Sequence, residues 1–322
     1  MTNKPIVISC GEPAGIGPEI AVAAWAALRD EMPLLWIGDP AHLPYETPYE
    51  LLRDVRETPQ PGKLGVLAHK VGKPATPGVP DAANAQTVID AIAHGVDCVT
   101  TGHARAICTA PIHKAALIDG ANFAYPGHTE YLAALAGVDR VVMMLACDAL
   151  RVVPTTIHIP LSEVPAQLTA SLLTNTLLIT HAALRRDFGI AAPRIAVAGL
   201  NPHAGEDGKM GREEIEMITP VLTALRNEGM NLSGPLSADT LFHAGARQHY
   251  DAAVCMYHDQ ALIPIKTLDF SGGVNVTLGL PFIRTSPDHG TAFDIAGQGV
   301  ADATSMIAAL RMARTMADAR GV

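Results

Sequence analysis

Short apolar runs rich in β-branched residues alternate with helical segments along most of this sequence, and this alternation constrains the fold most. The strand-like runs cover residues 5–10, 34–38, 106–110, 141–147, 151–159, 194–200 and 252–257. Helical spacing of apolar residues marks 84–102, 162–188, 212–228 and 302–320. Strands that alternate with helices are typical of α/β proteins. We therefore predict an α/β sandwich with a largely parallel sheet.

No change of composition divides the chain cleanly, so we treat residues 1–322 as one two-lobed catalytic unit. The Pro- and Gly-rich stretch 40–80 looks like a surface excursion with little regular core. If there are two lobes, the chain crosses between them more than once. We expect discontinuous lobes, about 1–125 with 265–322 and about 126–264, with a cleft at the crossing.

The charge balance and the cysteines narrow the class of protein. A formal charge of −9 argues against a nucleic-acid partner, because phosphate backbones require a basic face. No apolar segment has the roughly 20 residues of a membrane span, and the first residues do not form a signal peptide. Five scattered cysteines without a C-x-x-C pair indicate reduced, mostly buried thiols. We expect a cytoplasmic protein.

A glycine-rich turn, Gly11-Glu-Pro-Ala-Gly-Ile-Gly17, follows the first strand and precedes a helix that reaches about Asp30. This order invites comparison with a dinucleotide-binding fingerprint. Read from Gly15, the pattern fails, because Ile20 stands where the third glycine is required. We therefore interpret the turn as a structural element beside the cleft.

The stretch 257–284 gathers polar groups between apolar runs. It contains Tyr257-His258-Asp259-Gln260 and then Lys266, Asn275 and Arg284. The apolar runs 261–265 and 274–278 read as core, which predicts that the polar groups point into one cleft. Imidazole and carboxylate suit a divalent metal, whereas Lys, Asn and Arg suit a phosphate.

Three histidines share one context, since His158, His203 and His258 each lie at or just after the end of a predicted strand. Strand ends of α/β proteins open on the ligand crevice. Three neutral imidazoles suit Zn²⁺ or a similar ion. A single histidine in such a place is more often a polar residue satisfied by its surroundings, and without an H-E-x-x-H motif the spacing leaves that alternative open.

A second candidate anion site is the predicted helix start at His128 and Thr129, where free N–H groups and the helix dipole favour negative charge. A solvated surface with an ordinary helix cap is the alternative. Lys114, Asp239 and Asp259 lie at comparable turns and are candidate supporting or catalytic groups. The sequence contains no G-x-S-x-G nucleophile motif.

Seven blocks in order resemble the 4-hydroxythreonine-4-phosphate dehydrogenase family of vitamin B6 biosynthesis over essentially the whole chain. They are Gly11–Glu19, Thr109–Lys114, Gly127–Glu130, Asn201–Glu206, Gly234–Asp239, Tyr257–Gln260 and Gly273–Arg284. In the loop after His203, Asp207 and Lys209 stand where small or neutral residues are expected, which leaves cofactor contacts there unassigned.

The resemblance implies roles for the candidate residues. His158, His203 and His258 become ligands of a divalent metal (Zn²⁺, Mg²⁺ or Co²⁺), and NAD or NADP becomes the cofactor. The substrate contacts become His128, Thr129, Lys266, Asn275 and Arg284. The resemblance also implies a fold like the isocitrate and isopropylmalate dehydrogenases, and a homodimer whose active site is shared between subunits. We expect one subunit to supply 258–284 and the other to supply His158, His203, His128 and Thr129.

The expected reaction is oxidation of the C3 alcohol of 4-phosphooxy-L-threonine, followed by decarboxylation to 3-amino-2-oxopropyl phosphate. A sister family that oxidises 4-phospho-threonate or -erythronate shares the metal and phosphate residues and is an alternative. A metal-dependent phosphohydrolase or lyase and a non-catalytic binder of phosphorylated metabolites are alternatives from other classes.

Overall fold

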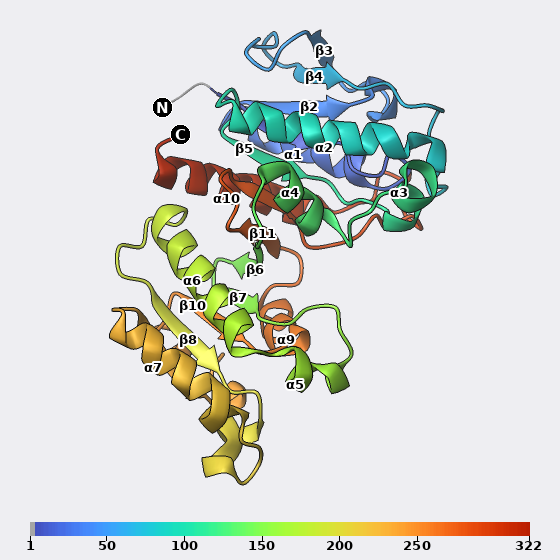
Figure 1. Cartoon of the computed structure of the whole chain (residues 1–322). Helices are drawn as coiled ribbons and strands as arrows, with labels where there is room; N and C mark the ends of the chain where they lie inside the picture. The colour runs from blue at the N-terminus through green and yellow to red at the C-terminus, as the bar shows by residue number, and fades with distance from the viewer. Residues whose placement is uncertain (1–3) are drawn as a thin grey trace. The chain divides into compact units, whose positions relative to one another are not determined.

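The computed structural model describes residues 4–322 and divides the chain into two compact units (Figure 1). Unit 1 contains residues 4–140 and 280–322, and unit 2 contains residues 141–279. Both boundaries lie 15 residues beyond those expected from the sequence (140 against 125, and 279 against 264). His128 and Thr129 therefore belong to unit 1, whereas Lys266 and Asn275 belong to unit 2.

Unit 1 is built on a parallel sheet with the strand order β3-β4-β2-β1-β5-β12. Its strands are β1 (Ile6–Ser9), β2 (Leu34–Gly38), β3 (Tyr49–Leu52), β4 (Leu64–Ala68), β5 (Ala106–Thr109) and β12 (Arg284–Pro287). Ile6 lies opposite both Leu34 and Ala106, so β1 is central and fully buried. The uninterrupted apolar sequences of β1 and β2 agree with burial on both faces.

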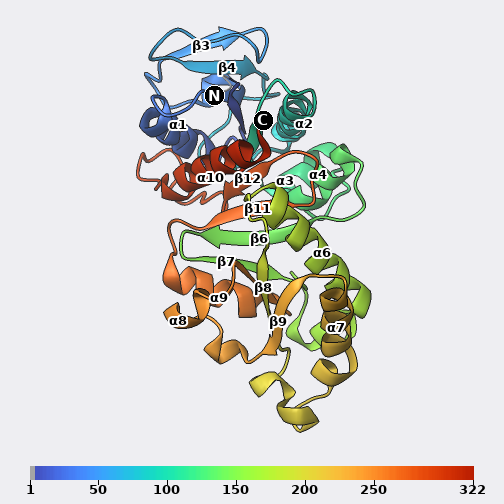
Figure 2. The same cartoon turned by 90° about the vertical axis from the view of Figure 1, so that its left-hand side faces the viewer.

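Helices cover both faces of this sheet, with α1 and α10 on one side and α2, α3 and α4 on the other (Figure 2). Their bounds are α1 (Gly17–Leu28), α2 (Ala85–Thr100), α3 (Lys114–Ala121), α4 (His128–Ala136) and α10 (Thr304–Arg320). Pro18 lies in the first turn of α1. Backbone N–H groups in this turn have no helical acceptor, so the missing N–H of proline costs no hydrogen bond. The α2 stripe of Val88, Ile92 and Val96 is buried, as its spacing predicted.

Unit 2 has a mixed sheet with the strand order β11-β6-β7-β10-β8-β9. Its strands are β6 (Val142–Cys147), β7 (Leu150–Pro154), β8 (Arg194–Ala198), β9 (Asn231–Leu236), β10 (Ala252–Cys255) and β11 (Val274–Leu278). β11, β6 and β7 pair antiparallel, whereas β7, β10, β8 and β9 are parallel. The parallel part brings the carboxyl ends of β7, β10 and β8 to one edge.

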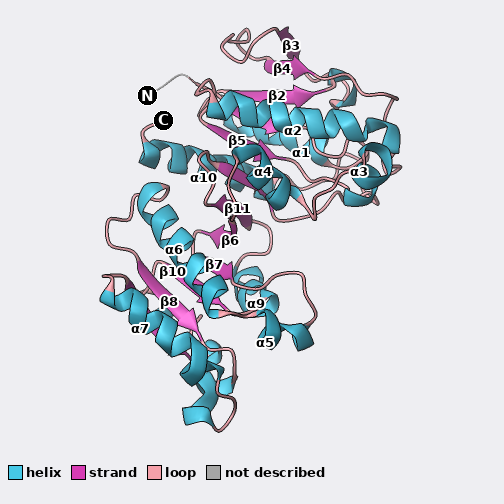
Figure 3. Cartoon of the chain, viewed as in Figure 1, coloured by secondary structure: helices cyan, strands magenta, loops and turns pink. Residues whose placement is uncertain are grey.

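Helices α6 and α7 pack on one face of the unit 2 sheet and α9 on the other (Figures 2 and 3). The helices are α5 (Val164–Gln167), α6 (Ala170–Arg186), α7 (Thr219–Asn227), α8 (Ala244–Arg247) and α9 (His258–Leu268), with a π-helical turn over Glu214–Ile218 before α7. Short 3-10 turns cover Pro40–His42, Ala82–Asn84, Leu161–Glu163, Pro202–Gly208 and Ala238–Thr240. The core between sheet and α9 includes Val152, Ala253 and Ile265.

The structure confirms the α/β class and corrects several predicted elements. The stretch 40–80, which we expected to be a surface segment with little regular core, forms part of the sheet. Its strands β3 and β4 extend the unit 1 sheet, and β4 is largely buried. The strand predicted over 151–159 ends at Pro154, so His158 lies in the following loop. The run 261–265 belongs to helix α9, which contains Pro264.

All five cysteines are free and buried, and burial raises the pKa of Cys10 and Cys108 to about 12. Within residues 4–322, no helix combines the length and apolar character needed to cross a bilayer.

Candidate active site

The glycine-rich turn after β1 packs closely against two other loops of unit 1. Gly11 has a φ of +65°, and a Cβ at this position would lie 2.3 Å from the carbonyl oxygen of Pro111. At Gly15 a Cβ would lie 2.8 Å from the carbonyl oxygen of Thr291, which also accepts the N–H of Ile16 at 3.0 Å. These glycines are required for close approach of backbones, which explains a glycine-rich sequence that lacks the dinucleotide register.

Arg284 begins β12 and is 3 % exposed, so its guanidinium is a buried cation. Its Nε and Nη2 donate to the hydroxyl of Thr109, at the end of β5, at 3.1 and 2.6 Å. Its Nη2 also lies 3.5 Å from Nδ1 of His128. Burial lowers the pKa of Arg284 to about 10. A charge held in this way favours an anionic ligand.

His128 is the first residue of α4, directly after Gly127. Its Nε2 atom is buried and has no hydrogen-bond partner among the described residues. Burial, and then the neighbouring charge of Arg284, hold the pKa of His128 well below its usual value, so the ring is neutral. Thr129 follows in the first turn, where backbone N–H groups are free of helical partners. Arg284, His128 and this helix start thus bring a positive charge and hydrogen-bond donors together, and their role as an anion site stays a prediction.

The carboxyl edge of β7 and β10 in unit 2 brings two of the predicted metal ligands together. The imidazole centroids of His158 and His258 are 5.7 Å apart. Both line a pocket of about 270 Å³, together with Thr156, Ile157, Ile159, Leu161, Val164, Tyr257 and Asp259. Nδ1 of His258 lies 2.7 Å from a carboxylate oxygen of Asp259. Such a contact orients an imidazole so that Nε2 can serve as the ligand atom.

His203 lies in a loop with unusual backbone geometry. Residues His203 to Asp207 all have positive φ, between 43° and 82°. Only one of them, Gly205, is a residue that adopts this conformation freely. Strained backbone of this kind persists where surrounding contacts hold it, and it concentrates at functional sites.

Glu214, at the start of the π-helical turn, holds that loop. It is 2 % exposed, and its carboxylate accepts the backbone N–H of Asn201 at 2.8 Å and the Asn201 side-chain amide at 3.0 Å. A Cβ at Gly205 would lie 2.6 Å from the same carboxylate. Glu213 also accepts the Asn201 amide, at 2.7 Å. The carboxylate of Glu214 therefore holds the loop by hydrogen bonds at Asn201, before His203, and packs closely against it at Gly205, after His203.

The metal triad is assembled only in part. Within residues 4–322, no three His, Cys, Asp or Glu side chains converge as a ready ion site, so His203 does not complete one with His158 and His258. His203 instead lies near Asp239, whose pKa is lowered first by the hydroxyl of Ser237 and, to a lesser degree, by His203. The two close imidazoles and the Asp259 contact nevertheless have the donor chemistry that a divalent cation requires. The three-histidine ligand set stays a prediction.

The remaining predicted residues are distributed as follows. Lys266 is in the last turn of α9, with Nζ 5.4 Å from the ring centre of Phe270. Asn275 is on β11 opposite Leu145, and its buried Oδ1 has no hydrogen-bond partner among the described residues. Lys114 is exposed at the start of α3. Three of the five predicted substrate contacts thus lie in unit 1 and two in unit 2.

The expected division of the site between subunits is wrong for two pairs. We expected His258 and His158 to come from different chains, and likewise Arg284 and His128. Each pair is in contact within one chain. The reason is topological: β7 pairs with β10, and β12 pairs with β5, so the loops that follow or precede these strands are neighbours.

Sequence reasoning missed two buried polar groups at the carboxyl edge of unit 1. Glu12 is 3 % exposed, and burial raises its pKa. His113 has a buried Nδ1 without a partner among the described residues and packs edge-on against Phe293 at 5.0 Å. The available signal was their position, since each follows within a few residues of a buried strand.

Comparison with known proteins agrees with this architecture. The family described as "Pyridoxal phosphate biosynthetic protein PdxA" matches residues 26–313. The chain is 67 % identical over 319 residues to a 4-hydroxythreonine-4-phosphate dehydrogenase of Roseobacter denitrificans, with 98 % of each chain covered. It is 60 % identical to the protein of that name from Paracoccus denitrificans, covering 98 % of this chain and 99 % of the relative.

Solved structures extend the likeness to three dimensions. A 4-hydroxythreonine-4-phosphate dehydrogenase from Klebsiella pneumoniae superposes with a TM-score of 0.90 at 38 % identity, over 98 % of this chain and 99 % of that one. A terephthalate 1,2-cis-dihydrodiol dehydrogenase from Burkholderia xenovorans gives a TM-score of 0.68 at 28 % identity, over 97 % and 98 %. The fold thus places the chain in a class of α/β proteins that includes dehydrogenases of small hydroxylated substrates. Within that class, the chain belongs to the pyridoxal phosphate biosynthetic protein PdxA family.

Proposed function

We propose that this chain is a metal- and NAD(P)-dependent dehydrogenase of 4-phosphooxy-L-threonine in pyridoxal 5′-phosphate biosynthesis. It oxidises the C3 alcohol, and the resulting β-keto acid loses CO₂ to give 3-amino-2-oxopropyl phosphate. The observation that carries the proposal is the buried Arg284–Thr109–His128 cluster at the start of α4, because it offers a phosphorylated substrate a preformed anion site in a chain of this family.

The proposed phosphate contacts are Arg284, His128 and Thr129 on unit 1 and Lys266 and Asn275 on unit 2. Arg284 supplies a charge-assisted, two-nitrogen contact, which fixes the phosphate in orientation as well as in position. The neutral ring of His128 can donate from one nitrogen. Binding energy from the remote phosphate then orients the reacting alcohol.

His158, His203 and His258 would hold a divalent cation (Zn²⁺, Mg²⁺ or Co²⁺), with Asp259 orienting the His258 ring. When bound, such a cation supplies Lewis acidity that lowers the pKa of a nearby alcohol. In the oxidation, the C3–H bond breaks as a hydride leaves for NAD or NADP and the hydroxyl proton is lost. In the second step the C–C bond to the carboxylate breaks, and the ketone accepts the electron pair until a proton is taken up.

A coupled assay tests the proposed chemistry. Purified protein with NAD or NADP and 4-phosphooxy-L-threonine should generate reduced nicotinamide, which absorbs at about 340 nm, together with CO₂. Phosphate release without nicotinamide would instead identify a hydrolase, and faster turnover of 4-phospho-threonate would identify the sister activity. A chelator should abolish turnover without unfolding the protein, and full activity in metal-free protein would refute the metal's role.

We also propose a homodimer in which unit 1 of one subunit and unit 2 of the other serve one active site. The division of the substrate contacts between the units supports this arrangement. Arg284→Ala and His258→Ala are two inactive parents whose lesions lie in different units. Heterodimers make up half of a random mixture, so about a quarter of all sites would carry neither lesion in a twofold dimer.

The matched control pairs two lesions of one unit, His158→Ala with His258→Ala, and should recover no activity because both residues lie in one chain's pocket. Demonstrated subunit exchange without recovery in the first mixture would rule out the shared site while leaving the dehydrogenase proposal intact.

A further inference from the structure

A pocket of about 910 Å³ opens at the edge of unit 1 opposite to the anion site. It is lined by the residues that start or precede the strands, including Pro5 before β1, Leu34 in β2, Lys63 before β4 and His103 before β5. Thr109 and the start of α4 follow the carboxyl ends of the same sheet. The two sites are therefore separated by the length of a strand, on the order of 15 Å.

The base of this pocket is apolar. Trp25, Met32, Leu34 and Val55 line it, and each is 4 to 6 % exposed. Such a surface can bury a flat apolar body of the size of a small ring system.

The rim of the pocket is cationic. Four lining side chains carry positive charge, namely Lys4, Arg29, Arg56 and Lys63, whereas two carry negative charge, Asp30 and Glu57. The lining has an excess of two positive charges (four minus two), of which Arg56 is paired with Asp54 just outside the lining, so one uncompensated positive charge remains in a chain whose formal charge is −9. A local reversal of sign beside an apolar surface selects for an acidic ligand.

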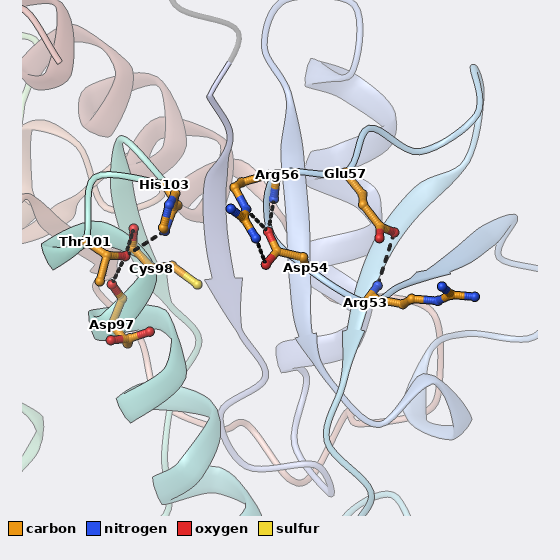
Figure 4. Close-up of polar contacts among 8 residues, drawn as sticks. All are labelled: Arg53, Asp54, Arg56, Glu57, Asp97, Cys98, Thr101 and His103. Carbon is orange, nitrogen blue, oxygen red and sulfur yellow. Dashed lines mark hydrogen bonds and ion pairs between the residues drawn. The ribbon is translucent and has the colours of Figure 1, made fainter.

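The rim is held in shape by its own hydrogen bonds, as Figure 4 shows. Arg56 donates from Nε and Nη2 to both carboxylate oxygens of Asp54, at 2.6 and 2.8 Å. Glu57 accepts the backbone N–H of Arg53 at 3.2 Å. Across the pocket, Nδ1 of His103 lies 2.9 Å from the hydroxyl of Thr101. Binding to a preformed rim loses little conformational entropy.

We propose that this pocket is a second ligand site, which binds a small aromatic acid: a planar apolar body that carries one or two acidic groups. The body lies against Val55 and the edge of Trp25, whose ring is covered by the guanidinium of Arg29 at 5.3 Å, and the acidic group contacts Arg29 and Lys63. None of the lining residues belongs to the proposed active site, so this pocket is a separate site from that one.

Two matched dyes test the proposal on the intact protein. The probe 1-anilinonaphthalene-8-sulfonate has the proposed chemistry, and N-phenyl-1-naphthylamine is its uncharged counterpart. The chain has only two tryptophans, Trp25 in this pocket and the fully buried Trp36. We expect one sulfonate dye per chain, with energy transfer from tryptophan that is reduced in Trp25→Phe, where only Trp36 remains as donor.

Charge and shape are then separated by substitution. The double variant Arg29→Ala/Lys63→Ala should bind the sulfonate dye at least tenfold more weakly and the uncharged dye less than threefold more weakly. Lys70→Ala with Arg185→Ala removes the same charge from exposed positions outside the pocket and should change neither. Thr58→Phe keeps the charge of the lining but narrows the mouth of the pocket, so it should weaken binding of both dyes and leave turnover of the proposed substrate unchanged.

Equal binding of the sulfonate dye to the pocket and control charge variants would overturn the proposal. So would undiminished binding of both dyes to Thr58→Phe, which also decides the matter if the double charge variant does not fold.

Discussion

Arg284 is a buried cation at the proposed phosphate site. Moving a guanidinium out of water costs free energy, which hydrogen bonds and an opposite charge offset. The hydroxyl of Thr109 and the ring of His128 contribute neutral contacts, and the pKa near 10 reflects the burial. Lys266, by contrast, is half-buried on the surface of α9. The two cations should therefore respond differently to substitution.

Replacing Lys266 by Ala should raise the KM for the phosphorylated substrate roughly 10- to 150-fold, because one charge-assisted contact contributes about 1.5–3 kcal/mol. For Arg284, Lys is the informative substitution, since it keeps the charge but loses the two-nitrogen contact. Steady-state kinetics with Lys70→Ala as control measures both effects. Unchanged KM and kcat in both variants would remove these residues from the phosphate site.

His128 should make the stability of the protein depend on pH. Burial and Arg284 lower its pKa in the folded state, whereas the unfolded chain binds a proton near pH 6.5. The unfolded state therefore binds more protons as the pH falls below about 6.5. The stability present above that pH is lost on acidification, by at most about 1.4 kcal/mol per pH unit for one group.

In His128→Asn, the free energy of unfolding should consequently fall less steeply between pH 7.5 and 5.5 than in the wild type. Chemical denaturation across this range measures the slope, and exposed His249→Asn serves as the control. Identical slopes for wild type and His128→Asn would show that the ring titrates normally.

Glu214 should act on metal binding through the backbone of the His203 loop. Its carboxylate accepts two bonds from Asn201 and faces Gly205, so Glu214→Ala releases the strained residues 203–207. We expect metal affinity to fall roughly 10- to 100-fold, as for other groups that orient a ligand. Glu216→Ala is the matched control, because this residue of the same turn is 61 % exposed and pairs with Arg212. Isothermal titration with Zn²⁺ and hydrogen exchange of 201–208 report the two effects, and equal affinity in both variants would contradict the assignment.

At the scale of elements, periodicity predicted β1, β2, β5, α2 and α10 well, because each buries one continuous apolar stripe or run. It failed at β3 and β4, which are short strands within a Pro- and Gly-rich stretch, where pairing of β4 with β2 and of β3 with β4 overrides a weak local preference. Similarly, the spacing of His158, His203 and His258 identified three loops at one sheet edge. It could not show which loops meet, because that depends on the pairing of β7 with β10.

The helix predicted over 162–188 is interrupted, and the interruption has a local cause. α5 ends at Gln167, and Thr169 starts α6 by accepting the N–H of Leu172 on its hydroxyl at 3.2 Å. Thr169→Ala should therefore lower the free energy of unfolding by about 1 kcal/mol, whereas Thr169→Ser, which can still cap, should lower it much less. Denaturant titration measures both, and an equal loss would mean that the methyl group matters rather than the cap.

At the scale of the whole molecule, the path of the chain governs which residues share a unit. Along the chain, unit 2 (residues 141–279) is inserted between the two segments of unit 1. Its first and last strands are neighbours in the sheet, since Val142 pairs with Leu278. The sequence predicted this discontinuity in kind. It misplaced both boundaries, because the antiparallel pair β6–β11 has no local signal that assigns it to one unit.

This path has a consequence for the order in which a ribosome completes the two units. β12 pairs with β5, and α10 packs against β5 and α1, so unit 1 lacks an edge strand and a covering helix until 280–322 have been synthesised. Unit 2 is complete in sequence once Gly279 has emerged. Although domains generally fold from the N-terminus onward during synthesis, here the inserted unit can finish first. A chain that ends at Gly279 and has been released from the ribosome should show protease protection over 141–279 and cleavage within 4–140, and the nascent protein would depend on chaperones at its beginning rather than at its end.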